Sequence, residues 1–387
     1  MTLSFRSSLS LSIFLLLYAA DAVLYSVRIT YGWPTPPVGL FASALAIVAF
    51  FLFSRPRKQL ILPAFCILGF MIAGLVAAAQ SDRYDLAWLS NYYWYAAAFI
   101  AGAFFIANYR FDSGREGRRT FLISLAVIVA ITYIYSSDRI LLLQERLNYI
   151  RVAGGTYSLL LLAIVTSANT RSKALIYLLG LVAIYLIGSR SWFYLWLITP
   201  LVYQIAQNGL GFKSAIRIAV LFVALGSGLL YVVMNNYFNI IDSRIVRLLL
   251  SSDTDTSLNE RSHLLQAGIR QIQESPLWGR YNGFLDYLDG GYIHNILSFW
   301  HQFGLIPFAI VVLMLALPIP KMLVGPAGGR SELFGRMVFI SALIQSVLAL
   351  SYVNHYLFFA FGVTYGLVGH TARHTSSDGK MVRKKSS

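Results

Sequence analysis

The sequence predicts an all-α, polytopic membrane protein, and three observations support this: its composition, the length of its apolar runs and the distribution of its charges. Hydrophobic residues make up 57% of the 387 residues and charged residues only 12%, whereas about 25% of a typical soluble domain is charged. A helix needs about 20 apolar residues to cross a bilayer. We expect about 12 transmembrane helices, over residues 8–25, 38–53, 60–79, 86–107, 121–135, 150–168, 174–188, 192–206, 216–234, 293–318, 334–350 and 353–369.

Basic residues gather on one side of the predicted topology. If the N-terminus is cytoplasmic and the helices alternate, the cytoplasmic segments hold 20 of the 31 basic residues and four of the 16 acidic residues. This asymmetry follows the positive-inside rule, so both termini are expected in the cytoplasm. It also accounts for the net charge of +15, and no nucleic-acid partner is expected. The single cysteine, Cys66, cannot form an internal disulfide.

Four regions follow from these runs. Residues 1–234 hold predicted helices 1–9, residues 235–292 form a long outer loop, residues 293–372 hold helices 10–12, and residues 373–387 form a basic cytoplasmic tail. The outer loop is far longer than a typical connection, and its aromatic content favours an ordered structure. A second outer segment, residues 136–151, is predicted to be an amphipathic helix in the interface. The first run also has features of a signal peptide, but we expect a retained span in a polytopic chain.

The long outer loop contains one predicted helix, near residues 258–275 in "SLNERSHLLQAGIRQIQESP". Ser257 and Glu260 have the S-x-x-E spacing of a capping box, and Pro276 ends the helix. Four apolar residues recur at helical spacing and predict one apolar face: Leu258, Leu265, Ile269 and Ile272.

Three outer residues are candidates for chemistry. Arg190, in "IGSRSW", lies where one run ends and the next begins, and it is either a ligand-binding or a snorkelling interfacial arginine. Arg261 opens the loop helix, where it binds an anion or pairs with a neighbouring acid. His294, in "GGYIHNILSFW", opens the run at 293–318. It is either a general base or a ring that forms hydrogen bonds with a neighbouring polar group.

Together these residues indicate chemistry on a diphosphate. Two guanidinium groups can bind a diphosphate through paired hydrogen bonds and stabilise it as it leaves. A neutral histidine can accept a proton from a sugar hydroxyl. We therefore expect Arg190 and Arg261 to bind the diphosphate and His294 to act as the catalytic base. Asn295 and His263 are expected to orient the acceptor.

No motif predicts a metal or another cofactor, and we expect neither. His294 and His301 are seven residues apart, but the chain has no H-E-x-x-H or comparable ligand spacing. The "GSG" at 226–228 lies inside an apolar run, and no G-x-S-x-G nucleophile motif occurs. Four aromatic residues form either a sugar-stacking platform or an interfacial belt: Trp278, Tyr281, Tyr287 and Tyr292.

The order of "GSRSW", "NERSHLLQAGIRQIQESPLWGRYNG" and "GGYIHNILSFWHQFGLIPF" resembles the O-antigen ligase and O-antigen polymerase family of bacterial envelopes, most closely over residues 188–307. The resemblance implies an all-helical glycosyltransferase of the inner membrane. Such an enzyme uses undecaprenyl-diphosphate-linked glycans at the periplasmic face, without a metal. The family's two arginines correspond to Arg190 and Arg261, and its His-Asn pair corresponds to His294 and Asn295.

Two features depart from the ligase pattern. Eight residues separate Asn295 from Gly304, where ligases have nine, and His301 and Gln302 stand where an acidic residue is common. The leading expectation is therefore a polymerase that transfers a growing glycan to the next lipid-linked repeat unit, with membrane lipid and a chain-length regulator protein as partners. The alternatives are a ligase that transfers the glycan to lipid A–core, and a flippase for lipid-linked oligosaccharides. A flippase is expected to carry more polar positions deep within its spans.

Overall fold

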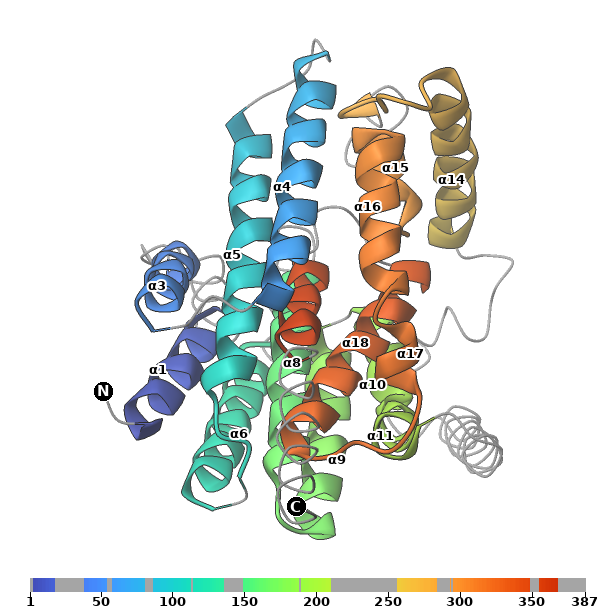
Figure 1. Cartoon of the computed structure of the whole chain (residues 1–387). Coiled ribbons are helices and arrows are strands. Elements are labelled where there is room, and N and C mark those ends of the chain that lie inside the picture. Colours follow the sequence, from blue (N-terminus) through green and yellow to red (C-terminus); the bar gives the residue numbers. More distant parts are fainter. Residues whose placement is uncertain are drawn as a thin grey trace.

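Every regular element in the described part of the protein is a helix, which confirms the predicted all-α class. The computed structural model describes residues 3–17, 38–53, 58–80, 86–112, 114–135, 149–187, 189–209, 256–283, 293, 295–348 and 355–367. The labelled helices (Figure 1) are α1 (Leu3–Leu15), α3 (Val38–Phe53), α4 (Lys58–Ala79), α5 (Leu86–Asn108), α6 (Arg115–Tyr135), α8 (Tyr149–Thr166), α9 (Thr170–Ile187), α10 (Arg190–Leu197), α11 (Thr199–Asn208), α14 (Thr256–Glu274), α15 (Leu297–Phe303), α16 (Leu305–Ala316), α17 (Ile319–Leu323) and α18 (Arg330–Leu348). A further helix, Tyr356–Leu367, is called the last helix below.

Three helical segments in this part of the chain are long and apolar enough to cross a membrane: Leu60–Ala79, Thr170–Ile187 and Leu305–Leu323. They coincide with predicted runs 60–79, 174–188 and the second half of 293–318. Four shorter apolar helices accompany them, at Phe5–Leu15, Phe41–Phe53, Val152–Thr166 and Tyr356–Leu367. The number of 12 spans stays a prediction, since the run at 216–234 and most of the outer loop lie outside the described residues.

One predicted transmembrane run, residues 293–318, is not a single helix, and that prediction is wrong. It forms α15 and α16, which meet at Gly304 with φ +85° and ψ −176°. α16 folds back along α15. The contact that shows this is the stack of the Trp300 and Phe308 rings, whose centroids are 5.0 Å apart. In a continuous helix eight residues would span about 12 Å. The segment that can cross a membrane therefore begins at Leu305 and ends at Leu323, and α15 lies before it.

A second predicted run, residues 192–206, bends in the middle. α10 ends at Leu197, and Ile198 adopts φ −87° and ψ 3° before α11 begins. Pro200 stands in the first turn of α11, where a residue without an N–H is tolerated. The N–H of Val202 still donates to the carbonyl of Ile198 at 3.0 Å. The helical path therefore continues through the bend.

Aromatic side chains pack where α15 meets α4, α5 and the last helix. Phe70 of α4 contacts Phe299 and Phe303 of α15, with ring centroids 5.8 Å and 5.5 Å apart. Tyr95 of α5 stacks on Phe358 of the last helix at 4.3 Å. These edge and stacked contacts add to the burial of apolar area. They fix α15 against α4, α5 and the last helix.

Glycines allow α5 and the last helix to pack in backbone contact. A Cβ atom on Gly102 would lie 2.4 Å from the carbonyl oxygen of Phe359, and one on Gly362 would lie 2.0 Å from that of Phe99. No larger residue fits at either position without a shift of the helices. Such reciprocal small residues are typical of helix pairs in membranes.

Large apolar side chains cover the outward faces of several helices. On α3 the exposed fraction is 74% for Phe51 and 65% for Phe41, and on α4 it is 66% for Phe65. In water such a continuous apolar face would promote aggregation, whereas against lipid it is favourable. The exposed faces therefore agree with the apolar helices in indicating a membrane protein.

The predicted loop helix at 258–275 is present as α14, which ends at Glu274 just before Pro276. Its predicted apolar face is partly wrong. Ile272 is buried, but Ile269 is 38% exposed, and Gly268 and Gln271 are buried instead. The close approach of α15 needs a small residue and a hydrogen-bonding residue there, and apolar periodicity does not reveal either. The predicted interfacial helix at 136–151 lies almost wholly outside the described residues, as does the tail.

Candidate functional site

The first candidate residue, Arg190, is the opening residue of α10. The chain leaves α9 at Ile187 and re-enters a helix at once, and the N–H of Phe193 donates to the carbonyl of Ser189 at 2.9 Å. From α18, the side-chain amide of Gln345 donates to the carbonyl of Ser191 at 3.3 Å. The backbone beside Arg190 is therefore held by the C-terminal end of α18.

The His-Asn segment is held by the same end of α18. The N–H of Ile296 donates to the carbonyl of Ser346 at 2.8 Å. Asn295 lies two residues before α15, and its Oδ1 accepts a hydrogen bond of 2.9 Å from the N–H of Leu297, the first residue of that helix. His294 itself lies outside the described residues. Since Gln345 and Ser346 are neighbours, α18 brings the Arg190 and Asn295 segments to one place.

The start of the last helix completes this junction. Tyr356 meets Trp192 of α10 edge to face, with ring centroids 5.1 Å apart. The ring of His355 stacks on Trp94 of α5 at 5.7 Å. Sequence reasoning missed His355, although "VNHY" places an asparagine and a histidine at the start of an apolar run, as "YIHN" does.

Two buried polar atoms at the junction have no hydrogen-bond partner among the described residues. They are the hydroxyl of Ser189, which is 1% exposed, and the indole nitrogen of Trp192, which is fully buried. A buried polar group without a partner costs about 1–3 kcal/mol. Ser189 directly precedes Arg190 in the sequence, and Trp192 stands two residues after it.

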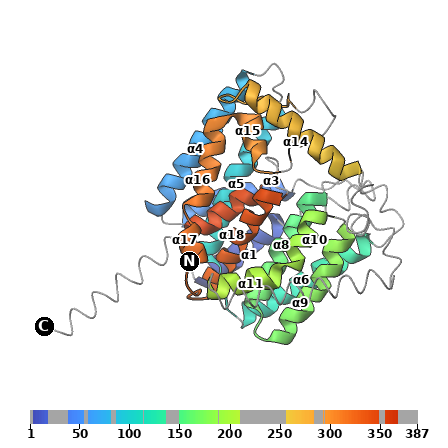
Figure 2. The same cartoon turned by 90° about the vertical axis from the view of Figure 1, so that its right-hand side faces the viewer.

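The second arginine, Arg261, stands in α14 at some distance from this junction. A Cβ atom on Gly268 would lie 2.3 Å from Cδ1 of Ile293, so α14 packs against the residue before His294. Arg261 is seven residues earlier, about 10 Å along the same side of the helix. Figure 2 shows the N-terminal end of α14 on the side of α8 and α10. His263 is exposed on this helix.

A chain of buried side-chain hydrogen bonds joins α14 to α15. His301 lies between two glutamines: its Nε2 pairs with Oε1 of Gln271, and its Nδ1 lies 2.8 Å from Nε2 of Gln302. All three side chains are at most 3% exposed. His301 therefore connects the loop helix to the helix that follows the His-Asn pair.

Backbone groups fix the direction of this chain. Gln271 Nε2 donates to the carbonyl of Gly283 at 3.0 Å, which turns its Oε1 to the histidine. Gln302 Oε1 accepts from the N–H of Asn282 at 2.8 Å, which turns its Nε2 to the histidine. His301 must then donate from Nε2 and accept at Nδ1, so the neutral ring satisfies every bond. Burial lowers the pKa of His301 to about 4, and the charge of Arg280 acts in the same direction.

The turn after α14 docks on the break between α15 and α16. The N–H of Leu305 donates to the carbonyl of Pro276 at 3.1 Å, and the N–H of Arg280 donates to the carbonyl of His301 at 2.6 Å. Gly279 and Gly304 touch here, since a Cβ atom on Gly279 would lie 2.4 Å from the nitrogen of Gly304. The loop helix α14 is thus attached to α15 and α16 at two places: through the buried hydrogen bonds of His301 and through this turn.

Of the two interpretations of the outer aromatic residues, a sugar-stacking platform or an interfacial belt, the platform is wrong for Tyr281. Its side chain is 4% exposed and packs against Phe303 at 6.0 Å, so its ring is not open to a sugar. Trp278 is 47% exposed, and Tyr287 and Tyr292 lie outside the described residues. Hydropathy alone does not distinguish an aromatic residue that faces the outer space from one that packs on a neighbouring helix.

Metal ligands do not gather in the part of the chain that the structure describes: it holds no group of three His, Cys, Asp or Glu side chains. Both ring nitrogens of His301 are occupied by glutamine amides.

Neither a protein-family model nor a curated protein matches the sequence.

Proposed function

We propose that the protein is a membrane glycosyltransferase that lengthens a surface polysaccharide. It transfers a growing glycan from undecaprenyl diphosphate to the next lipid-linked repeat unit, as in the O-antigen polymerases that the sequence resembles. The acceptor is a sugar hydroxyl on that repeat unit, and the leaving group is undecaprenyl diphosphate. A chain-length regulator is the expected protein partner.

One observation carries this proposal. Ser191 and Ile296 lie 105 positions apart in the sequence, yet both bind adjacent residues of α18, Gln345 and Ser346. Each lies within a motif of the resemblance: Ser191 follows Arg190, and Ile296 follows the His-Asn pair. Motifs that are brought together by hydrogen bonds support a shared site better than their order in the sequence does.

The proposed chemistry divides the work among few residues. Arg190 and Arg261 bind the diphosphate and stabilise its charge as the glycosidic bond breaks. His294 accepts the proton from the attacking hydroxyl. The Oδ1 of Asn295 accepts the Leu297 N–H, so its Nδ2 is the group that orients the acceptor, and His263 of α14 contributes from the loop side. No metal or cofactor takes part.

The proposed location is the bacterial inner membrane, with both termini cytoplasmic and the site at the periplasmic face. α9 supports this orientation, since Arg171 and Lys173 lie at its start and Arg190 follows its end. A cysteine at Ser252 should react with an impermeant thiol reagent in spheroplasts, and one at Ser376 only after permeabilisation. Reversed labelling would overturn the orientation. These two positions lie outside the described residues.

The test is a transfer assay with purified protein and lipid-linked repeat units. Chain lengthening supports a polymerase, and transfer to lipid A–core supports a ligase. His294→Ala should lose transfer by about 10²–10⁴, the usual contribution of a general base, and should still bind the lipid-linked donor. An active His294→Ala enzyme would exclude the base assignment. Loss of donor binding would move His294 into the diphosphate site.

One observation favours transport as the second candidate. Discontinuous helices are common at the substrate sites of transporters, and α15 and α16 break at Gly304 with an extended ψ of −176°. A flippase would move lipid-linked oligosaccharide across vesicles and leave its length unchanged. The same protein in vesicles with labelled repeat units therefore distinguishes the two functions.

A further inference from the structure

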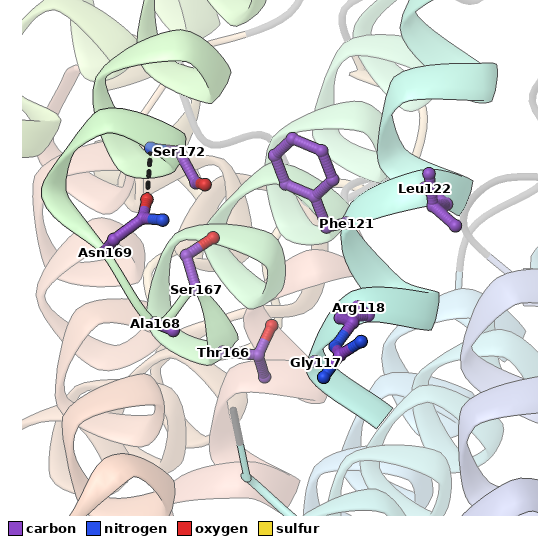
Figure 3. A pocket seen from close by; sticks show the side chains of 9 residues that line it. All are labelled: Gly117, Arg118, Phe121, Leu122, Thr166, Ser167, Ala168, Asn169 and Ser172. Carbon is purple, nitrogen blue, oxygen red and sulfur yellow. Dashed lines mark hydrogen bonds between the residues drawn. The ribbon is translucent and has the colours of Figure 1, made fainter. Parts of the chain in front are cut away.

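A pocket lies between α6 and the connection from α8 to α9, away from the junction at Arg190. Its volume is about 470 Å³. Figure 3 shows Arg118 and Phe121 of α6 on one side, and Thr166, Ser167 and Asn169 on the other. A volume of this size is in the range of small-ligand sites.

Hydrogen-bond donors line this pocket. Asn169 Oδ1 accepts the N–H of Ser172 at 2.7 Å, which turns its Nδ2 to the pocket (Figure 3). Arg118 is exposed and makes no ion pair with any residue that the structure describes. The hydroxyls of Thr166 and Ser167 already donate to carbonyls of their own helix. A guanidinium and an amide are therefore available to a ligand, and both suit an anion.

The charge around the pocket is positive. Arg330 of α18 reaches the pocket wall, where its Nη1 donates to the carbonyl of Thr166 at 3.4 Å. The nearest acid on that helix, Glu332, is already paired with Arg336 at 2.6 Å. The remaining charges at the start of α9, at the start of α6 and in the turn before α6 are Arg110, Asp112, Arg115, Glu116, Arg118, Arg119, Arg171 and Lys173. Six bases against two acids favour a negatively charged ligand.

The helices that form the pocket also present apolar faces to the outside. On α6 the exposed fraction is 63% for Leu122 and 60% for Val129, and on α9 it is 59% for Leu178 and 51% for Val182. α6 and α9 pack against each other, so these faces continue from the pocket along the helix pair. A ligand with an anionic head and apolar chains would contact both features.

We propose that this pocket binds the headgroup of an anionic phospholipid, with the acyl chains along the outer face of α6 and α9. Arg118 and the amide of Asn169 bind the phosphate, and Phe121 contacts the glycerol. Basic pockets between membrane helices are the expected sites for such headgroups. The site is separate from the transfer reaction and does not depend on it.

Native mass spectrometry of the purified protein tests this, with phosphatidylglycerol and phosphatidylcholine added in detergent. The wild-type protein should bind phosphatidylglycerol more tightly than phosphatidylcholine. Arg118→Gln should weaken phosphatidylglycerol binding about fivefold, the effect of about 1 kcal/mol per basic residue. Arg119→Gln is the matched control: it removes the same charge from the next residue, which does not line the pocket, and should leave binding unchanged.

A second variant tests the volume instead of the charge. Ser172→Trp fills the pocket with Arg118 intact and should also abolish the preference for phosphatidylglycerol, while the unfolding temperature stays near that of the wild type. Equal losses in Arg118→Gln and Arg119→Gln would overturn the site, since the attraction would then be diffuse. Soluble glycerol 3-phosphate that competes as well as the lipid would overturn the lipid assignment and indicate a free phosphate ester.

Discussion

Gln345 donates a hydrogen bond of 3.3 Å from its side-chain amide to the carbonyl of Ser191, the residue after Arg190. Gln345 is 2% exposed, so no water replaces this contact at low cost. The bond fixes the start of α10 against the end of α18, where Ser346 also accepts the N–H of Ile296. Gln345 is a positioning residue for the proposed site.

Gln345→Leu should therefore lower kcat by about 10- to 100-fold, the effect of a displaced reacting group, with little change in KM for the donor. Gln204→Leu is the control, because its amide oxygen pairs only with Asn208 on the exposed face of α11. Steady-state kinetics well below the unfolding temperature measure both variants. A folded Gln345→Leu enzyme with wild-type kcat would remove α18 from the site.

Lysine should not replace either arginine, because it lacks the planar fork that binds two phosphate oxygens. Arg190→Lys and Arg261→Lys are expected to fold and to bind the lipid-linked donor at least tenfold more weakly, the effect of about 1.4 kcal/mol. Arg270→Lys is the control for Arg261→Lys, since Arg270 is exposed farther along α14. Donor binding in nanodiscs measures the loss. Wild-type affinity in either lysine variant would exclude that residue from the diphosphate site.

The sequence predicts the helices well where one uniform apolar run has polar ends. Residues 38–53 are predicted and observed as α3 without any shift, and α5 begins at Leu86 as predicted. The fold-back at Gly304 was missed, although Pro307 is a marker of a helix start. The turn from Ser275 to Arg280 stabilises that break through hydrogen bonds to Leu305 and His301, and no local pattern reveals such a contact.

The candidate site shows the same limit. The motifs around Arg190 and Asn295 could be read from the sequence because residue type and order carry them. Gln345 and Ser346 could not, because they act through one side-chain amide and one backbone carbonyl of an ordinary apolar helix. In the sequence, His301 stands out only as a departure from the ligase pattern, and its two glutamine partners are visible only in three dimensions.

Three glycines separate the effects of backbone strain and crowding. Gly304 has φ +85°, and a Cβ atom there would lie 2.1 Å from the carbonyl oxygen of Leu277. Gly325 has φ +73° with nothing within 4 Å, and Gly329 has neither feature. Gly304→Ala should lower the free energy of unfolding by more than the roughly 1–3 kcal/mol of backbone strain alone. Gly325→Ala should lower it by about that amount or less. Gly329→Ala should leave it almost unchanged.

Thermal unfolding in detergent ranks the three glycine variants. The order Gly304→Ala, Gly325→Ala, Gly329→Ala is expected from the least to the most stable protein. A Gly304→Ala variant as stable as Gly325→Ala would mean that the turn at Leu277 does not press on the break between α15 and α16.

His301 should make stability depend on pH. Its pKa is lowered to about 4 in the folded protein, below the value of about 6.5 for a free histidine. The unfolded state therefore binds the proton first as the pH falls, so stability decreases from about pH 6.5 down to about pH 4. A proton on Nδ1 would also face the donor Nε2 of Gln302. At 1.36 kcal/mol per pKa unit, the full loss is roughly 3 kcal/mol.

Unfolding temperatures at pH 7 and pH 5 measure this effect, and the comparison with variants isolates it from other titrating groups. His301→Gln removes the titrating ring, so it should lower stability at pH 7 and flatten the decrease toward pH 5. His263→Gln is the matched control, because His263 is exposed on α14 and should leave the decrease unchanged. If His301→Gln shows the same pH dependence as the wild type, the neutral ring between Gln271 and Gln302 does not stabilise the contact of α14 with α15.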